Sequence, residues 1–267
     1  MKKRVGSLVS GIVLVVLLVA LALYNSPARQ QRAAQPSRLA GGPERDVRKI
    51  GEQDLERLYP DLILRTGKNV GKLVCLTFDD GPDATYTPAV LDVLKQKNVK
   101  ATFFLIGKRV EENPDIAKRI ADEGHLIGNH TYSHANLDKA SPEVEQEISK
   151  AEAAFKPLGF TGNNLFRPAY GAANPSLVEQ VANLGYKIAM WSVDTLDWRG
   201  LSAAEVLKNV TNTVTPGAVI LQHSAGGPGE DLSGSVAAIP QIIDQLQAQG
   251  YRFVRMDEMF PLEGTDP

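Results

Sequence analysis

The sequence predicts an α/β protein in which about seven parallel strands form a sheet that is closed, or nearly closed, into a barrel, preceded by a single N-terminal transmembrane helix. Three observations lead to this prediction. Apolar, strand-like runs alternate with helical stretches, as they do in parallel sheets covered by helices. Ionisable residues follow the strands, at the end where parallel barrels place their active sites. An apolar run near the N-terminus is long enough to span a bilayer.

The N-terminal apolar run covers residues 5–24 and contains no charged residue. As a helix it would be about 30 Å long, which matches the hydrocarbon thickness of a membrane. Lys2, Lys3 and Arg4 precede it, so we expect residues 1–24 to be a signal anchor or a cleavable signal peptide. An anchor would make the protein single-pass in the cell membrane, with an extracytoplasmic body. Cleavage would make it a secreted protein.

Residues 25–71 are expected to form a flexible stalk and a transition into the folded domain, because 25–50 combine three prolines with no apolar periodicity.

The distribution of charge differs between the N-terminal region and the rest of the chain. The first 50 residues carry nine basic and two acidic residues, a net charge of +7, whereas the other 217 carry 20 and 29, a net charge of −9. An acidic body argues against nucleic-acid binding. The single cysteine, Cys75, excludes an intrachain disulfide.

From residue 72 the alternation becomes regular, and we expect a catalytic domain over 72–262 followed by a tail at 263–267. The predicted strands lie at 73–78, 101–106, 125–128, 165–166, 187–193, 218–222 and 252–255. Four helix starts are predicted where a capping residue precedes proline: Thr87-Pro88, Asn113-Pro114, Ser141-Pro142 and Asn174-Pro175. Residues 202–205 match a capping box, and Gly124 and Gly185 lie where helices should end.

Polar residues follow five of these strands directly. They are Asp79 and Asp80, His130 and His134, Arg167 and Tyr170, Asp194, and His223. A single one of these could belong to a turn or a helix cap, since Asp-Gly-Pro sequences favour turns. Five at the carboxyl ends of successive parallel strands predict one shared active site.

A metal centre is the first chemistry that these residues suggest. His130 and His134 are separated by three residues, so both rings can reach one ion, and Asp79 or Asp80 can supply a third ligand. Two histidines and one carboxylate leave positions open for water, as in catalytic sites. The other aspartate could then accept a proton, held by a bidentate contact from Arg167.

His223 is the candidate general acid, which would protonate a leaving amine if a carboxylate orients its ring. We expect Asp194 to be that carboxylate. Trp198 and Leu221 could line a small apolar pocket. The sequence contains no G-x-S-x-G elbow and no Gly-rich phosphate loop, so a serine hydrolase and a nucleotide-binding protein are both disfavoured.

Five segments, taken in order, resemble the motifs of the polysaccharide deacetylase family (the NodB homology domain, carbohydrate esterase family 4). They are Thr77-Phe78-Asp79-Asp80-Gly81, His130-Thr131-Tyr132-Ser133-His134, Arg167-Pro168-Ala169-Tyr170-Gly171, Asp194-Thr195-Leu196-Asp197-Trp198 and Leu221-Gln222-His223. The resemblance covers about residues 72–262. It implies a distorted (β/α) barrel that removes N-acetyl groups from sugar polymers with one divalent metal ion.

The resemblance also implies a role for each site residue. Asp79 corresponds to the catalytic base, Arg167 to the arginine that positions it, and His223 to the acid, tuned by Asp194. The backbone N–H of Tyr170 corresponds to an oxyanion donor. The implied metal ligands are Asp80, His130 and His134, and the implied acetyl pocket is Trp198 and Leu221. Two departures are Ala169 in place of a second proline, and Ser224-Ala225-Gly226-Gly227 after His223, where many members have Asp.

The sequence leaves the polymer and the metal open. Peptidoglycan is the first expectation, because an anchored extracytoplasmic domain faces the cell wall, and chitin-like oligomers are the second. The same site could also belong to an O-acetyl-xylan esterase or to a hydrolase of small cyclic amides, and the domain could be a non-catalytic glycan-binding module. Zn²⁺ suits the ligand set, and Co²⁺, Mn²⁺ or Ni²⁺ would also be accepted.

Overall fold

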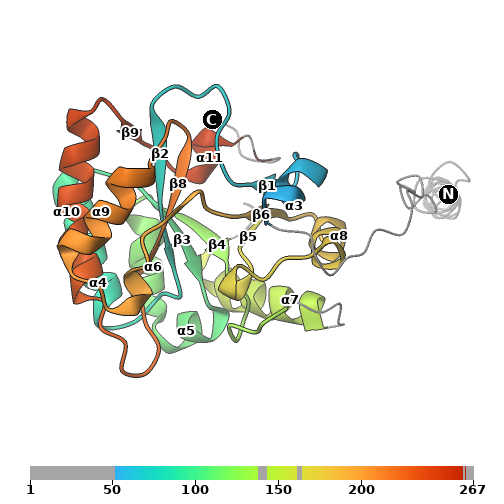
Figure 1. Ribbon diagram of the computed structural model, residues 1–267. Helices are drawn as coiled ribbons and strands as arrows, with labels where there is room; N and C mark the ends of the chain where they lie inside the picture. Colours follow the sequence, from blue (N-terminus) through green and yellow to red (C-terminus); the bar gives the residue numbers. More distant parts are fainter. Residues whose placement is uncertain (1–51, 138–142, 161–163, 261, 263–267) are drawn as a thin grey trace, which may run out of the picture. The chain divides into compact units, whose positions relative to one another are not determined.

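The computed structural model describes residues 52–137, 143–160, 164–260 and 262 (Figure 1). The predicted membrane segment at 5–24, the stalk as far as residue 51 and the tail at 263–267 lie outside these residues. Among the described residues, no helix is both long and apolar enough to cross a membrane.

Nine strands form one sheet within the described residues. They are β1 (Ile63–Leu64), β2 (Leu73–Asp79), β3 (Thr102–Leu105), β4 (Leu126–Asn129), β5 (Leu165–Phe166), β6 (Lys187–Ala189), β7 (Val193–Asp194), β8 (Ala218–His223) and β9 (Arg252–Phe253). The strand order is β1-β6-β5-β4-β3-β2-β8-β7, and β9 pairs with the start of β2. Every strand pair is parallel, which confirms the predicted parallel α/β sheet.

The sheet is curled rather than closed by continuous pairing, and the segment predicted as one strand at 187–193 explains why. It divides into β6, which pairs with β1 and β5, and β7, which pairs with β8. Between them, the backbone N–H of Ser192 donates to the carbonyl of Val219 over 3.0 Å. This segment therefore begins near one end of the strand order and finishes at the other, which bends the sheet into an incomplete barrel.

The folded domain begins ahead of residue 72, so the predicted transition at 51–71 is largely structured. It contains α3 (Glu52–Leu58) and β1. Leu55 and Ile63 are buried in one apolar cluster with Phe166. A short helix and a two-residue strand carry too few residues for their periodicity to be recognised in the sequence.

Helices cover the outside of the curled sheet. They are α4 (Tyr86–Lys97), α5 (Gly107–Glu112), α6 (Pro114–Asp122), α7 (Glu143–Phe155), α8 (Pro175–Asn183), α9 (Ala203–Thr213) and α10 (Ser233–Ala248). The short helix α11 (Met256–Met259) instead packs its two methionines into the cluster of Cys75. Figure 1 shows α4, α9 and α10 together along one side of the sheet.

The predicted helix caps at Asn174 and Ser202 are confirmed. The cap at Thr87 is wrong, because α4 starts at Tyr86 and the Thr87 hydroxyl donates to the Ser224 carbonyl. Asn113 precedes α6 without a side-chain cap, and Ser141-Pro142 lies outside the described residues.

Alternation along β2 places the first pair of aspartates. Leu76 and Phe78 belong to the cluster that packs under α4 and α10, whereas Cys75 faces the barrel interior with Phe104 and Val219. Because side chains alternate along a strand, Asp79 also points inward, and Asp80 follows where the strand has ended.

Candidate active site

Nine of the ten predicted site residues line a single cavity of about 410 Å³ at the carboxyl ends of the strands. They are Asp79, Asp80, His130, His134, Tyr170, Asp194, Trp198, Leu221 and His223. The tenth, Arg167, is fully buried and bonded to Asp79. The five strand ends that were predicted to share one site therefore surround one cavity. Gly171, Trp191 and Glu230 complete the lining.

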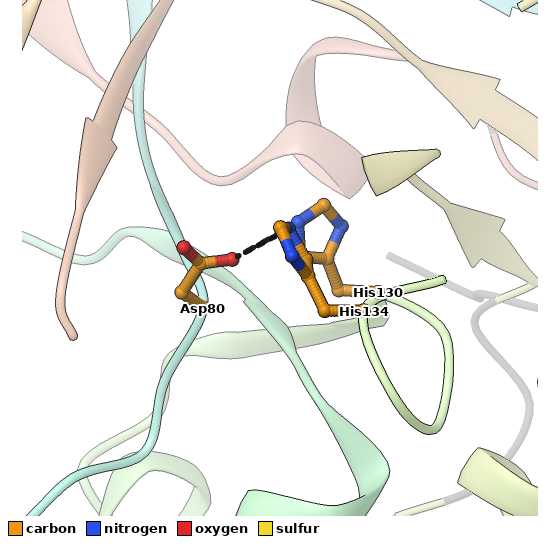
Figure 2. Close-up of side chains that lie close together, drawn as sticks. All are labelled: Asp80, His130 and His134. Atoms are coloured by element: carbon orange, nitrogen blue, oxygen red, sulfur yellow. Dashed lines mark ion pairs between the residues drawn. The ribbon is translucent and has the colours of Figure 1, made fainter. Parts of the chain in front are cut away.

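Asp80, His130 and His134 form a set of ligands suited to a metal ion. Their donor atoms all lie within 4.8 Å of one another. The Oδ1 atom of Asp80 is 3.3 Å from His130 Nε2 and 3.2 Å from His134 Nε2. Figure 2 shows the carboxylate of Asp80 facing the two rings. That buried oxygen has no hydrogen-bond partner. Two imidazole nitrogens and one carboxylate oxygen that converge in this way fit a divalent cation.

A hydrogen bond to the backbone fixes the ring of His130. Its Nδ1 lies 2.7 Å from the carbonyl oxygen of Arg167. A carbonyl can only accept, so Nδ1 carries the hydrogen, and Nε2 can offer its lone pair to a metal. Burial raises the pKa of Asp80, but without a metal a protonated His130 beside the carboxylate outweighs burial and holds that pKa well below its usual range. The carboxylate is therefore ionised, as a metal ligand must be.

Asp79 is held by a buried arginine. Its Oδ1 accepts from Arg167 Nη1 over 2.7 Å, and neither side chain is more than 5 % exposed. The contact is single rather than bidentate as predicted, because Nε donates to the Ala189 carbonyl and Nη2 to the Met190 carbonyl. Removing one partner of such a buried pair typically costs about 3–5 kcal/mol.

His223 is oriented by Asp197, which corrects the prediction that Asp194 does this. His223 Nδ1 lies 2.7 Å from Asp197 Oδ1, whereas Asp194 Oδ1 accepts from the N–H of Leu196. Asp197 is itself fixed, because its Oδ2 accepts from the His223 N–H over 2.9 Å and from the Ser235 hydroxyl over 2.6 Å. Burial lowers the pKa of His223, but the hydrogen bond and charge of Asp197 raise it to about 9.

The rim of the cavity is aromatic. Tyr170 and Trp198 are the exposed large hydrophobic residues among the described residues, at 68 % and 44 %. The Tyr170 ring lies 4.5 Å from that of His134, and Leu221 is buried below. The sequence prediction missed Trp191, which it placed within an uninterrupted strand, and Glu230, which follows the Gly-rich loop after His223. Asp197 lies inside one of the five motifs, but no role was predicted for it.

Left-handed backbone conformations gather in the loops of this site. Asp80, Thr131, His134, Tyr170 and Leu196 have φ values between 56° and 70° although none is glycine. Such a conformation costs about 1–3 kcal/mol at a non-glycine residue and persists only where surrounding contacts enforce it. Three of these residues, Asp80, His134 and Tyr170, line the cavity.

Comparison with known proteins identifies the family. Residues 66–189 match the family model described as polysaccharide deacetylase. A peptidoglycan-N-acetylglucosamine deacetylase of Bacillus cereus is 50 % identical over 188 residues, which are 70 % of this chain and 68 % of that protein. The Listeria monocytogenes peptidoglycan-N-acetylglucosamine deacetylase PgdA is 37 % identical over 84 % of this chain, and the chain spans about half of its length, 48 %. A chitooligosaccharide deacetylase of Azorhizobium caulinodans is 36 % identical over 67 % of this chain and 90 % of that protein.

Solved structures agree. The crystal structure of a peptidoglycan N-acetylglucosamine deacetylase superposes with a TM-score of 0.74 at 44 % identity, covering 79 % of this chain and 98 % of that chain. A protein from Bacillus anthracis described as a family 4 pseudoenzyme superposes with a TM-score of 0.69 at 30 % identity, covering 75 % and 69 %. This chain therefore belongs to the polysaccharide deacetylase family, carbohydrate esterase family 4.

Proposed function

We propose that this protein is a metal-dependent hydrolase that removes N-acetyl groups from N-acetylglucosamine-containing polysaccharide, with peptidoglycan as its polymer. One observation carries the proposal. A cation-binding triad, an arginine-held carboxylate and an aspartate-backed histidine face the same cavity. Amide hydrolysis needs these three things together: an electrophile, a base for water and an acid for the departing amine.

Asp80, His130 and His134 would hold the metal, for which Zn²⁺ is the first choice, although Co²⁺, Mn²⁺ or Ni²⁺ would also suit these ligands. When bound, a divalent ion polarises the acetyl carbonyl and lowers the pKa of water. The His130 Nδ1–H bond to the Arg167 carbonyl supports this assignment, because it keeps Nε2 turned toward Asp80.

Proton transfer falls to two residues at the ends of the neighbouring strands β2 and β8, Asp79 and His223, which are register partners. Asp79 accepts the proton of the attacking water, and Arg167 holds the carboxylate in place while it does so. His223 donates a proton to the sugar nitrogen as the amide bond breaks. Its raised pKa supports this role, because a general acid must carry its proton at the working pH.

Substrate positioning involves the rim of the cavity. The backbone N–H of Tyr170 is the proposed donor to the oxyanion, since its turn at φ 61° lies beside the metal-binding triad. Trp198 and Leu221 supply apolar surface for the acetyl methyl group. Asp194 lines the same cavity but forms no hydrogen bond with His223. We therefore do not propose that Asp194 orients the general acid.

The decisive experiment is acetate release from purified peptidoglycan by the full chain, with mass analysis to show which sugar has lost its acetyl group. Chelation should abolish the release, and one equivalent of Zn²⁺ should restore it. Parallel arms with chito-oligosaccharides, acetylated xylan and small cyclic amides test the competing substrates. A protein that binds glycan with no metal-dependent turnover in any arm would instead be a binding module.

Two further points stay proposals. Chito-oligosaccharide deacetylation is the second candidate function, favoured by the similarity to the Azorhizobium caulinodans enzyme. Anchoring to the cell membrane through residues 5–24 rests on their composition. Retention of the full chain in the membrane fraction after alkaline extraction would support an anchor, and release of a shortened chain into the medium would support cleavage.

A further inference from the structure

The start of α5 contacts two of the loops that carry site residues, through backbone hydrogen bonds. The N–H of Ile106 donates to the carbonyl of Gly81 over 3.0 Å, next to Asp80. The N–H groups of Gly107 and Lys108 donate to the carbonyls of Thr131 and Tyr132, over 3.0 and 2.9 Å. These two carbonyls lie between His130 and His134. The loops that supply the three metal-binding side chains are therefore tied to one helical turn.

Arg109 adds a third loop to this junction. Its Nη1 donates to the carbonyl of Asp80 over 3.0 Å, and its Nη2 donates to the carbonyl of Gly226 over 2.8 Å. Gly226 belongs to the Gly-rich loop that follows His223. One half-buried guanidinium thus joins the loop of the metal-binding carboxylate to the loop of the acid.

The helix that carries Arg109 is itself fixed from behind. A side-chain carbon at Gly107 would lie 2.7 Å from the Cα atom of Ala151 in α7, which is closer than any such contact normally occurs. The close approach of α5 to α7 therefore requires glycine there. Because α5 is packed so tightly, its contacts with the loops can hold them in one position.

The backbone at Asp80 needs such support. Its φ of 70° is unfavourable for a residue with a side chain, and it is this turn that directs the carboxylate toward His130 and His134. A hydrogen bond from a charged guanidinium is stronger than one from a neutral donor. On the other side, the Gly-rich segment at 226–229 has little intrinsic preference for one conformation, so an external contact is needed to define it.

We propose that Arg109 is a positioning residue of the active site, which holds the Asp80 loop and the loop after His223 at a defined separation. The inference rests on the proposed function, because it takes Asp80 as a metal ligand and His223 as the acid. Arg109 does not touch the reacting atoms in this assignment. It acts through the two carbonyl groups that it binds.

Arg109→Met in the full chain tests the proposal, because methionine keeps an unbranched chain and removes every donor. We expect kcat for acetate release to fall about 10–100-fold and the dissociation constant for Zn²⁺, measured by chelator competition, to rise by a similar factor. Arg109→Lys should lie between wild type and Arg109→Met, because an ammonium group keeps the charge and lacks the planar fork that reaches both carbonyls.

Arg119→Met is the matched control. Arg119 lies on α6 and pairs with Asp92 and Glu123, away from the cavity. The Arg119→Met variant should have a lower melting temperature than wild type. Its kcat and its Zn²⁺ affinity should stay within twofold of the wild-type values. The same pattern in Arg109→Met would overturn the proposal. If wild type releases no acetate from any polymer, the proposed function fails, whereas a lowered Zn²⁺ affinity in Arg109→Met would still support the role of Arg109.

Discussion

Replacing Asp197 with asparagine removes the negative charge beside His223 and keeps a side chain of nearly the same shape. In the wild type, burial lowers the pKa of His223, and the hydrogen bond and charge of Asp197 outweigh burial to raise it to about 9. Against an ordinary value of about 6.5, this difference corresponds to roughly 3 kcal/mol in favour of the protonated ring. Without the charge, burial remains, so the pKa should fall to about 6.5 or below.

The loss of activity in Asp197→Asn should depend on pH, because it follows the protonated fraction of His223. At pH 8 the protonated fraction of His223 should fall from about nine-tenths to about 3 %, which predicts a loss of roughly 30-fold in kcat/KM. At pH 6 the same ring is about three-quarters protonated in the variant, so most of the deficit should disappear. A bound dication lowers the pKa of His223 in both proteins, so the pH values at which the deficit appears and disappears move down together, while the difference between the two pKa values persists.

The assay is kcat/KM for acetate release between pH 5.5 and 9.5, together with an NMR titration of His223 in metal-free protein. Asp194→Asn is the matched control. Asp194 lines the same cavity but has no hydrogen bond to His223, so its variant should keep the alkaline limb of the wild-type profile. The reasoning is refuted if Asp197→Asn loses activity equally at all pH values, or if Asp194→Asn shifts the alkaline limb instead.

Further predictions use the same variants or simple substitutions. Asp79→Asn should lower kcat by at least about 100-fold with unchanged Zn²⁺ content, because the base is lost while the three proposed metal ligands remain; substantial remaining activity would reassign the base. His134→Ala should weaken Zn²⁺ binding at least about 100-fold in chelator competition, and unchanged affinity would exclude it as a ligand. Gly107→Ala should destabilise the fold by about 1–3 kcal/mol in urea unfolding, because α7 leaves no room for a methyl group, and a neutral result would refute that. Because the pKa of His223 is higher in the folded than in the unfolded chain, its stabilisation is complete below pH ~6.5 and lost as pH rises through about 9. Relative to Asp197→Asn, metal-free wild type should therefore lose up to roughly 3 kcal/mol of stability over that range in urea unfolding, and parallel curves would contradict this.

Seven strand segments were predictable because each is an apolar run, and five of them are followed directly by polar groups, whereas β1 is too short to be recognised. β5 matches its predicted range, and β2 extends the predicted run by one residue, to Asp79. The break between β6 and β7 was not predictable from hydropathy. Met190 and Ser192 continue the strand pattern in sequence, and the change of partner from β5 to β8 depends on how far the sheet curls. The amino-acid composition of the segment does not indicate how strongly the sheet curves.

The error at Asp194 shows where reasoning from strand ends stops. Asp194 ends β7 opposite Leu221, two residues before His223, so the parallel register made it the natural partner. The chain then turns at Leu196, whose φ is 56°, and Asp197 enters a short 3-10 helix, η4 (Asp197–Arg199). That turn brings Asp197 back beneath His223, where two hydrogen bonds join the pair. The position of a residue at the end of a strand predicts which residues lie beside it on the neighbouring strands. It does not predict the path of a loop that turns back toward the sheet.

The same limit applies to the whole site, because its geometry is held by residues that perform no chemistry. Asp80, His134 and Tyr170 occupy left-handed conformations that are uncommon for residues with a side chain, although aspartate and histidine adopt them more often than most. Each conformation persists because neighbouring groups enforce it, and around Asp80 those groups are Ile106 and Arg109 on or beside α5. The motifs that carry the chemistry can therefore be recognised from the sequence, whereas the contacts that make them work come from a helix outside the motifs.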